Sequence, residues 1–393
     1  MRDFITDKLK NIKPSGIRKF FDIVAASGGK IISLGVGDPD FSTPWEIRNA
    51  GALCLQKGIT HYTSNIGLPE LRGEISRYLA DRFRVRFAAD EIMLTIGASE
   101  AIDLTLRAVT EEGDEVLIPD PSYVSYAPCV QLCGGTPVAV PCSAENGFKL
   151  TPEMLEKKIT PKTKALIFPY PNNPTGGIME REYLEALVPV ILKHDLLVIS
   201  DEIYAELTYG GRHVSIAEYE ELKHNVVLIS GFSKSFAMTG WRLGYLCAES
   251  GLLQGILKIH QYTTICAPVM SQYAALEGLK EGAKDDFSFV AEMREEYDRR
   301  RRFLYSSLNA MGLKCFEPKG AFYIMPSVAH LHMTGEEFAS RLLEEEKVAV
   351  VPGDAFGESG EYFVRCSYAT GMEQLSEAVR RMEAFVKRQE KRK

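Results

Sequence analysis

Long apolar runs are missing from this chain of 393 residues. No run approaches the ~18 consecutive apolar residues that a membrane-spanning helix requires, and the first residues include no apolar signal segment. Excess positive charge is missing as well, because 46 lysines and arginines stand against 53 aspartates and glutamates, a net charge of −7. We therefore predict a cytoplasmic protein whose partners include neither a membrane nor a nucleic acid.

The common metal and redox motifs are also missing. The eight cysteines include no C-x-x-C pair, and the seven histidines include no H-E-x-x-H spacing. These absences predict reduced thiols and no bound metal. The chain does have the composition of an ordinary globular enzyme, with 45% apolar and 25% charged residues. Its length exceeds the roughly 250–300 residues at which single cores stop growing, so we expect two lobes.

One stretch of the chain places two cations after a buried strand. Val226-Val227-Leu228-Ile229 is an apolar run of the kind that forms a strand buried on both faces. Small residues follow it and indicate a turn, in which Lys234 is followed eight residues later by Arg242. A solvated loop with two scattered cations is the plain alternative, but it gives no purpose to the glycines and serines around them.

The segment from Ser233 to Arg242 resembles the cofactor-lysine signature S-K-x-x-x-[ML]-x-G-x-R of the class I pyridoxal-phosphate aminotransferases. The resemblance extends from Gly35 to Arg365. It implies an α/β protein of fold type I, with a mostly parallel seven-stranded sheet flanked by helices in a large domain and a smaller α+β domain. We place an N-terminal arm at 1–30, with a short helix at about 17–26, the large domain at 31–280 and the small domain at 281–393.

Strands alternate with helical stretches from about 91 to 248, which by itself predicts β-α-β units and a mostly parallel sheet. Ligands of such sheets bind beyond the carboxyl ends of the strands. Residues 97–99, 123, 173, 201 and 234 all fall at strand ends in this interpretation. Gly97-Ala98-Ser99-Glu100 also forms the junction between a strand and a helix at about 98–109, and a helix N-terminus favours an anion.

The resemblance assigns roles to these residues. It implies pyridoxal 5′-phosphate as cofactor, with Lys234 as its Schiff-base anchor and general base, Asp201 on the ring nitrogen, and Tyr204 on the ring oxygen. The other cofactor contacts it implies are Ala98, Ser99, Ser233, Arg242, Tyr123 and Asn173, together with Tyr62 from a neighbouring subunit. The substrate carboxylate would be held by Gly37, Asn173 and Arg365. A site shared in this way implies a homodimer, with twofold symmetry as the default.

The activity implied by the resemblance moves the amino group of an aromatic or aspartate-like L-amino acid to 2-oxoglutarate. A pyridoxal-phosphate lyase of the same fold would share the cofactor residues, and an N-acyl-diaminopimelate aminotransferase is a further alternative. A transcription regulator with an aminotransferase-like domain would need an attached DNA-binding domain, which the sequence does not display. A catalytically dead homologue is disfavoured because Lys234, Asp201 and Arg365 are all present.

The substrate side departs from two known patterns of the family. Enteric-type aspartate aminotransferases have an arginine for the distal carboxylate just before the segment that matches Ala267-Pro268, where this chain reads His260-Gln261-Tyr262-Thr263-Thr264. A related subgroup has a lysine where this chain has Ser99. We therefore expect the distal group to be recognised by hydrogen bonds and aromatic contact. The candidates are Tyr262, Tyr323, Ile17 and Arg18.

Overall fold

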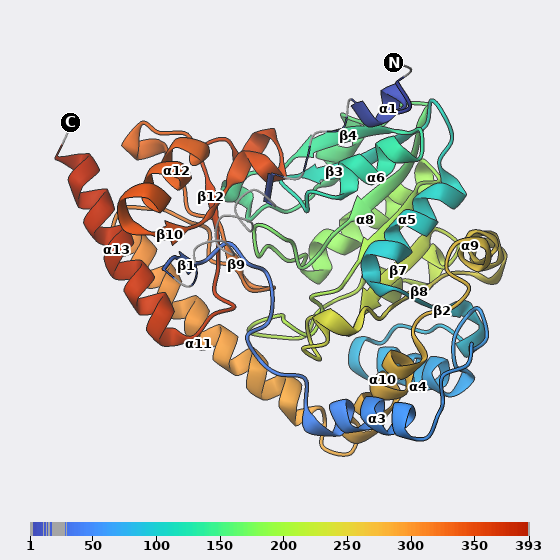
Figure 1. The fold of residues 1–393 in the computed structure, drawn as a ribbon. Helices are drawn as coiled ribbons and strands as arrows, with labels where there is room; N and C mark the ends of the chain where they lie inside the picture. Colours follow the sequence, from blue (N-terminus) through green and yellow to red (C-terminus); the bar gives the residue numbers. More distant parts are fainter. Residues whose placement is uncertain are drawn as a thin grey trace.

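The computed structural model describes residues 3–10, 12, 14, 16, 17, 28 and 30–391. Figure 1 shows two parts side by side, a larger one built on a twisted sheet and a smaller one that carries the C-terminus. The predicted helix at about 17–26 lies almost entirely outside the described residues, and so does Arg18. No described helix combines the length and the apolar composition that crossing a bilayer requires.

The predicted seven-stranded sheet is confirmed, with strand order β2-β8-β7-β6-β5-β3-β4. Only β8 runs antiparallel to its neighbours; the other pairs are parallel. The strands are β2 (Ile92–Thr95), β3 (Glu115–Asp120), β4 (Thr136–Pro141), β5 (Thr163–Phe168), β6 (Leu197–Asp201), β7 (Val226–Gly231) and β8 (Gly244–Cys247). The central strands β5, β6 and β7 are apolar almost throughout because helices cover both faces of the sheet.

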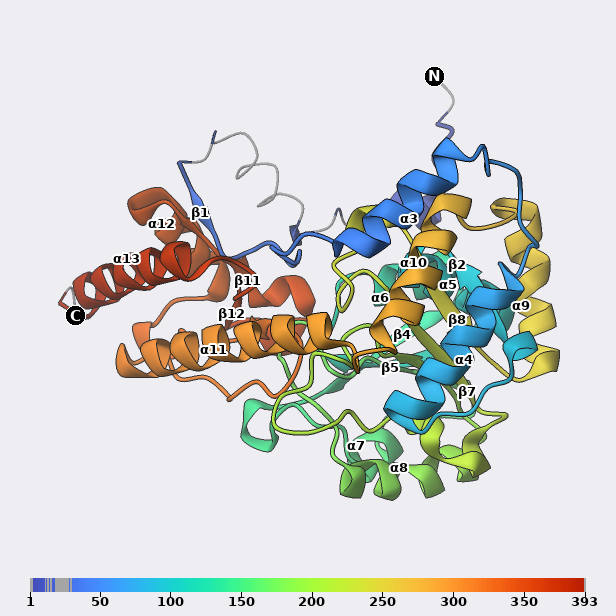
Figure 2. The same cartoon turned by 90° about the horizontal axis from the view of Figure 1, so that it is seen from below.

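Each face of the sheet packs on its own set of helices. Successive strand residues point to opposite faces, so Val198 joins one apolar core while its neighbour Ile199 joins the other. On the Ile199 face lie α5 (Gly97–Val109), α6 (Tyr126–Leu132) and α9 (Ser250–Thr263); the opposite core includes α3 (Trp45–Gln56), α4 (Pro69–Phe83), α7 (Pro152–Glu156), α8 (Arg181–Lys193) and α10 (Val269–Gly282). Figure 2 shows α3, α4 and α10 lying together at one end of this part.

The smaller part has a separate apolar core. It contains α11 (Ser288–Ala310), α12 (Gly335–Glu346), α13 (Met372–Glu390) and the short strands β9 (Tyr323–Ile324), β10 (Val348–Ala349), β11 (Val351–Pro352) and β12 (Val364–Ser367). The N-terminal strand β1 (Ile32–Ser33) pairs in parallel with β10 of this part. The long helix α11 runs along it toward the larger part (Figure 2). The domain boundaries after residues 30 and 280 stay a prediction.

Several local predictions match the observed elements closely. The helix predicted at about 98–109 is α5. In the structure, Thr151 caps α7 by accepting a hydrogen bond from the backbone N–H of Met154. Arg365 lies in a short strand, since β12 contains only Val364–Ser367. The backbone carbonyl of Glu361 instead accepts a hydrogen bond from the N–H of Gly335 at the start of α12.

Candidate active site

A cavity of about 770 Å³ lies where the carboxyl ends of the parallel strands face the smaller part of the molecule. Of the residues singled out from the sequence, it is lined by Gly37, Ala98, Ser99, Tyr123, Asn173, Asp201, Tyr204, Ser233, Lys234, Arg242 and Arg365. These residues come from segments up to 328 positions apart, since Gly37 and Arg365 (365 − 37 = 328) both reach the cavity. Tyr62 does not line it and has 80% of its surface exposed.

Lys234 follows the end of β7 and reaches into the cavity. Its Nζ donates a hydrogen bond to the backbone carbonyl of Gly37, 2.7 Å away. Burial lowers the pKa of Lys234 to about 8, against the opposing effect of the Asp38 carboxylate, and the positive charges of Arg365 and Arg242 lower it further. An amine with a pKa near neutrality can serve both as a nucleophile and as a proton acceptor.

Asp201 is the last residue of β6, and its carboxylate is buried beside the cavity. Burial raises its pKa to about 6, although hydrogen bonds to the carboxylate oppose the rise. Oδ2 accepts a hydrogen bond of 2.8 Å from the hydroxyl of Tyr126, and Oδ1 accepts one of 3.2 Å from the N–H of Ile203. A buried carboxylate of this kind is stable in its charged form when a cation is added beside it.

Tyr126 was not identified from the sequence as a site residue. It opens α6 three positions after Tyr123, and the two rings meet edge to face with centroids 5.5 Å apart. Tyr123 lies in the turn before α6, so the helical spacing of side chains gave no signal that linked the two residues. Nothing local indicated that Tyr126 would be turned toward the end of β6.

The N-terminus of α5 forms one end of the cavity. Gly97, Ala98 and Ser99 begin this helix, so their N–H groups and its dipole favour an anion here. Arg242 lies against the same turn, because a Cβ added to Gly97 would come within 2.6 Å of its Nη2. Gly97 also has a positive φ of 74°. Glycine is therefore required at this position both for the backbone conformation and for the approach of the guanidinium group.

A second glycine holds this turn against the sheet. A Cβ added to Gly244 would lie 2.6 Å from the backbone nitrogen of Ala98. Gly244 is the first residue of β8 and is paired in register with Gly231, the last residue of β7. The helix start therefore rests directly on bare backbone of the sheet, without an intervening side chain.

Arg365 lies at another side of the cavity with only 2% of its surface exposed. Its Nη1 donates a hydrogen bond of 2.9 Å to Oδ1 of Asn173, and its Nη2 donates one of 2.5 Å to the carbonyl of Gly35. The guanidinium carbon lies 4.4 Å from the ring centre of Tyr323 and 4.7 Å from that of Phe356. Nε is buried without a hydrogen-bond partner. Burial lowers the pKa of this arginine, so an incoming carboxylate would be a favourable partner.

The candidates for the distal substrate group are separated by the structure. Ile17 and Tyr323 line the cavity, whereas Tyr262 does not and has 87% of its surface exposed. The hydroxyl of Tyr323 lies 2.9 Å from the hydroxyl of Tyr204. Tyr323 is therefore engaged with a predicted site residue and does not simply project into open space.

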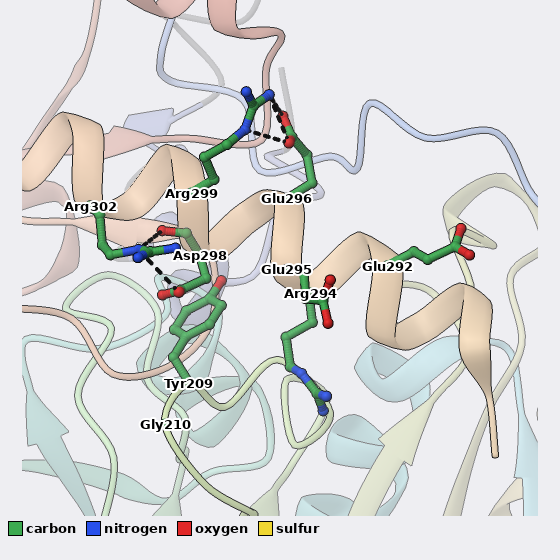
Figure 3. A pocket seen from close by; sticks show the side chains of 9 residues that line it. All are labelled: Tyr209, Gly210, Glu292, Arg294, Glu295, Glu296, Asp298, Arg299 and Arg302. Carbon is green, nitrogen blue, oxygen red and sulfur yellow. Dashed lines mark hydrogen bonds and ion pairs between the residues drawn. The ribbon is translucent and has the colours of Figure 1, made fainter.

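A second hollow, of about 660 Å³, lies on the outer face of α11 beside Tyr209 and Gly210 (Figure 3). Four of its charged side chains form two ion pairs along the helix. Arg299 contacts Glu296 at 2.8 Å, and Arg302 contacts Asp298 at 3.2 Å. None of the residues predicted to form the site lines this hollow.

The fold and the cavity agree with a comparison against known families. Residues 29–382 match the family described as aminotransferase class I and II, and the chain belongs to this family. It is thus an aminotransferase, of the fold type I expected from the sequence.

Three curated relatives are similar over nearly the whole chain. The putative aminotransferase YugH of Bacillus subtilis is 51% identical, and the alignment covers 98% of this chain and 99% of the relative. The aspartate aminotransferase of Pyrococcus abyssi is 46% identical, with 98% of each chain covered. The aromatic-amino-acid aminotransferase 2 of Thermococcus litoralis is 43% identical, again with 98% of each chain covered.

Solved structures of similar proteins show the same architecture. The aromatic aminotransferase of Pyrococcus horikoshii superposes with a TM-score of 0.89 at 44% identity, covering 95% of this chain and 99% of the other. The aspartate aminotransferase of Thermus thermophilus with maleate superposes with a TM-score of 0.93 at 35% identity, covering 98% of this chain and all of the other.

Proposed function

We propose that this protein is a pyridoxal-phosphate-dependent aminotransferase that transfers the amino group of an aromatic or aspartate-like L-amino acid to 2-oxoglutarate. The observation that carries the proposal is the position of Lys234. Its amine, with a pKa of about 8, shares one cavity with the carboxylate of Asp201 and the guanidinium group of Arg365. This combination provides a nucleophilic amine, an anion and a cation for three different parts of a bound molecule.

The residues around the cavity fit pyridoxal phosphate. The start of α5 and Arg242 form a cationic turn suited to a phosphate group. Among the described residues, the groups that donate hydrogen bonds to the buried Asp201 are the neutral Tyr126 hydroxyl and Ile203 N–H, so a protonated pyridine nitrogen would supply a cation that these bonds do not. The amine of Lys234 is a nucleophile of the kind that could bond to the aldehyde carbon of pyridoxal phosphate. Ser99, Ser233 and Tyr123 complete the wall of the cavity at this end.

When bound, pyridoxal phosphate supplies an electron sink for the electrons released at the α-carbon of the substrate. The protein's own groups hold the reactants and move the proton. Arg365 holds the substrate carboxylate, with Asn173 and the backbone at Gly37 beside it. Lys234 Nζ, which is partly neutral near pH 7, can accept a proton from the α-carbon and return it. Asp201 would keep a proton on the ring nitrogen of the bound cofactor, and Tyr204 would donate a hydrogen bond to its ring oxygen.

We further propose a homodimer in which Tyr62 serves the cavity of the neighbouring subunit. Tyr62, Tyr262 and Ile265 are exposed apolar residues of this chain, with 80%, 87% and 41% of their surfaces exposed. The two loops that carry them are joined, because Nδ2 of Asn65 donates a hydrogen bond to the carbonyl of Ile265. Exposed aromatic side chains on two connected loops are typical of an interface between subunits.

The cavity suggests a broad donor range. Within the described part of the chain, the lysines and arginines that line it are Lys234, Arg242 and Arg365, and each already has a proposed role. Among the described residues, no further fixed cation of the cavity is therefore left for a distal carboxylate. Tyr123, Tyr126 and Tyr323 supply aromatic surface instead. The relatives named after aspartate and after aromatic amino acids both agree with such a pocket.

The test begins with the covalent anchor. The loaded protein is reduced with borohydride, and the labelled peptide is identified by mass spectrometry. The label is expected on Lys234, and Lys234→Ala should lose both label and turnover. Lys193→Ala is the matched control and should behave as wild type. It removes an amine of α8 that is paired with Glu156. A label on another lysine would contradict the assignment.

The substrate is tested by measuring kcat/KM for phenylalanine, tyrosine, aspartate, alanine and an N-acyl-diaminopimelate, with 2-oxoglutarate as acceptor, under one set of conditions. Aromatic and acidic donors should both react, with one 2-oxo acid and one glutamate formed per turnover. A preference for aspartate over phenylalanine above roughly a thousandfold would reveal a dedicated cation, since apolar size differences usually provide only ~10–200-fold. Consumption of amino acid without formation of glutamate would indicate the lyase alternative.

A further inference from the structure

Two buried tyrosine hydroxyls meet at the boundary between the two parts of the molecule. Oη of Tyr204 and Oη of Tyr323 are 2.9 Å apart, and either can be the donor. Tyr204 follows β6 of the large sheet, whereas Tyr323 begins β9 of the smaller part. Both side chains are buried, so this hydrogen bond is shielded from competing water.

Tyr323 also contacts the groups that surround the proposed substrate position. The centre of its ring lies 4.4 Å from the guanidinium carbon of Arg365. The ring centre of Phe356 lies 4.7 Å from the same carbon. A side chain at Gly37 would overlap the Tyr323 hydroxyl, so this hydroxyl lies directly against the backbone at Gly37. The backbone carbonyl of Gly37 also accepts the hydrogen bond from Lys234. Tyr323 is thus in contact with the carboxylate clamp and with the segment that holds the lysine.

The direction of the tyrosine–tyrosine hydrogen bond follows from counting protons. Each phenol has one proton to donate and an oxygen that can also accept. In the proposed function, Tyr204 donates its only proton to the ring oxygen of the cofactor. Only Tyr323 can then donate across the 2.9 Å contact. A donor to the Tyr204 oxygen polarises its O–H bond and makes Tyr204 a stronger donor in turn.

We propose that Tyr323 is a positioning residue of this aminotransferase, whose hydroxyl donates to Tyr204 Oη and directs the Tyr204 proton toward the cofactor ring oxygen, while its ring seats the guanidinium group of Arg365. The proposal rests on the proposed function, because it concerns the same cavity. The role of Tyr323 goes beyond the proposed function, because one side chain would link Arg365, which holds the carboxylate, to the hydrogen bond at the ring oxygen.

The decisive experiment is a spectrophotometric pH titration of the cofactor-loaded protein without substrate. The Lys234 nitrogen and the negatively charged ring oxygen share a proton, so weaker hydrogen-bond donation to the oxygen raises the midpoint of the titration. For Tyr323→Phe we expect the midpoint to rise by about 0.3 to 1 pH unit, which corresponds to the loss of one neutral hydrogen bond. Tyr204→Phe should raise it further, because the donor itself is lost.

The matched control is Tyr297→Phe. Tyr297 is buried on α11 and packs against Phe322, but its hydroxyl has no hydrogen-bond partner. This variant makes the same chemical change in the neighbouring core and should leave the midpoint unchanged. A Tyr323→Phe protein that titrates with the wild-type midpoint would overturn the proposal.

A double variant tests whether Tyr323 acts through Tyr204. In the presence of Tyr204→Phe, the additional Tyr323→Phe change should have no further effect on the midpoint. Two independent, additive shifts would contradict the proposal, because Tyr323 would then act by another route. The role of the ring is read from KM: Tyr323→Leu should raise the KM for 2-oxoglutarate at least fivefold above that of Tyr323→Phe, and equal KM values would overturn the seating of Arg365.

Failure of this inference and failure of the proposed function give different results. A wild-type protein that binds pyridoxal phosphate and titrates normally, but whose midpoint is unaffected by Tyr323→Phe, contradicts only the role of Tyr323. A wild-type protein that takes up no pyridoxal phosphate contradicts the proposed function, and the role of Tyr323 with it.

Discussion

Tyr126 donates its hydroxyl proton to Oδ2 of Asp201 across 2.8 Å, and both side chains are buried. The hydrogen bond connects the first turn of α6 to the end of β6, two elements that are 75 residues apart. It stabilises the charged form of the carboxylate and so opposes the effect of burial on the pKa of Asp201. The ability of Asp201 to pair with a cation in the cavity therefore depends on Tyr126.

Removal of this donor is the first prediction. Tyr126→Phe should raise the pKa of Asp201 above its value of about 6, so that more of the carboxyl group is protonated at a given pH. We expect kcat/KM at pH 6 to fall about fivefold and the acidic limb of its pH profile to move up by about one pH unit, as for loss of a hydrogen bond to a charged group. Tyr209→Phe, which removes a buried hydroxyl bonded to the carbonyl of Ala321, is the control. An unchanged acidic limb in Tyr126→Phe would contradict the argument.

The second prediction concerns stability without cofactor. Folding raises the pKa of Asp201 from 3.8 to about 6. A carboxyl group of this kind contributes stability below its unfolded pKa and loses that contribution as the pH rises through its folded pKa. Asp201→Asn should therefore be more stable than wild type at pH 8, by about 2–3 kcal/mol, with the difference disappearing toward pH 4. The measurement is urea unfolding of the cofactor-free proteins at pH 4, 6 and 8.

Asp114 provides a control of opposite sign for this measurement. The backbone N–H of Glu111 and the amine of Lys164 hold the pKa of Asp114 below its ordinary value. Its contribution to stability is therefore present at neutral pH and is lost in acid. Asp114→Asn should be less stable than wild type at pH 8, and the two should converge at low pH. A pH-independent difference for Asp201→Asn would show that its carboxyl group is not strained by burial.

The third prediction uses the lowered pKa of Lys234. The neutral amine is the form that attacks an aldehyde. The rate at which the cofactor-free protein takes up pyridoxal phosphate should therefore increase with pH around a midpoint near 8. Asp38 raises the pKa of Lys234, so Asp38→Asn should move the midpoint to lower pH. Stopped-flow absorbance measures the rate.

Asp40→Asn is the control for the Asp38 variant, because the carboxylate of Asp40 is already paired with Arg300 at 2.8 Å. It should leave the midpoint of cofactor uptake where it is in the wild type. A wild-type midpoint close to that of a solvated lysine, at roughly 10.4, would mean that the cavity does not depress the pKa.

The fourth prediction concerns assembly. If Tyr62 serves the cavity of the neighbouring subunit, mixed dimers of Tyr62→Ala and Lys234→Ala chains contain one cavity with both native residues and one with neither. Such dimers should recover about half of the wild-type activity per dimer, although each parent is inactive or strongly impaired. Activity is measured after the two variants are co-refolded and the mixed dimer is isolated by differential tags. Mixed dimers no more active than the parents would exclude a shared site.

Much of the site could be predicted from the sequence because parallel strands align their ends. Asp201 ends an apolar strand and Lys234 follows another, and β6 and β7 are adjacent in the sheet. Local patterns of apolar and turn residues were therefore enough to place these two side chains on one edge. The cap at Thr151 could be predicted for the same reason, since it depends only on residues within one turn.

The contacts that could not be predicted join elements distant in sequence. The hydrogen bonds from Tyr126 to Asp201 and between Tyr204 and Tyr323 depend on how α6 and β9 are packed, which no periodic pattern encodes. Tyr262 is a candidate from the sequence that the structure does not place in the cavity. Its aromatic character suggested contact with a substrate, but its position at the end of α9 leaves it exposed and outside the cavity of its own chain.

The contact between Gly244 and the start of α5 has a consequence for how this sequence can vary. A methyl group on Gly244 would overlap the backbone of Gly97 and Ala98, and neither can retreat while Arg242 packs against Gly97 on its other side. In a library in which every codon is randomised and survivors are selected for growth on the enzyme's product, position 244 should tolerate no replacement at all. Gly240, whose added Cβ would meet nothing within 4 Å, should tolerate alanine in the same selection. Two glycines four residues apart would thus differ in their tolerance of substitution, because backbone lies against Gly244 whereas the space beside Gly240 is open.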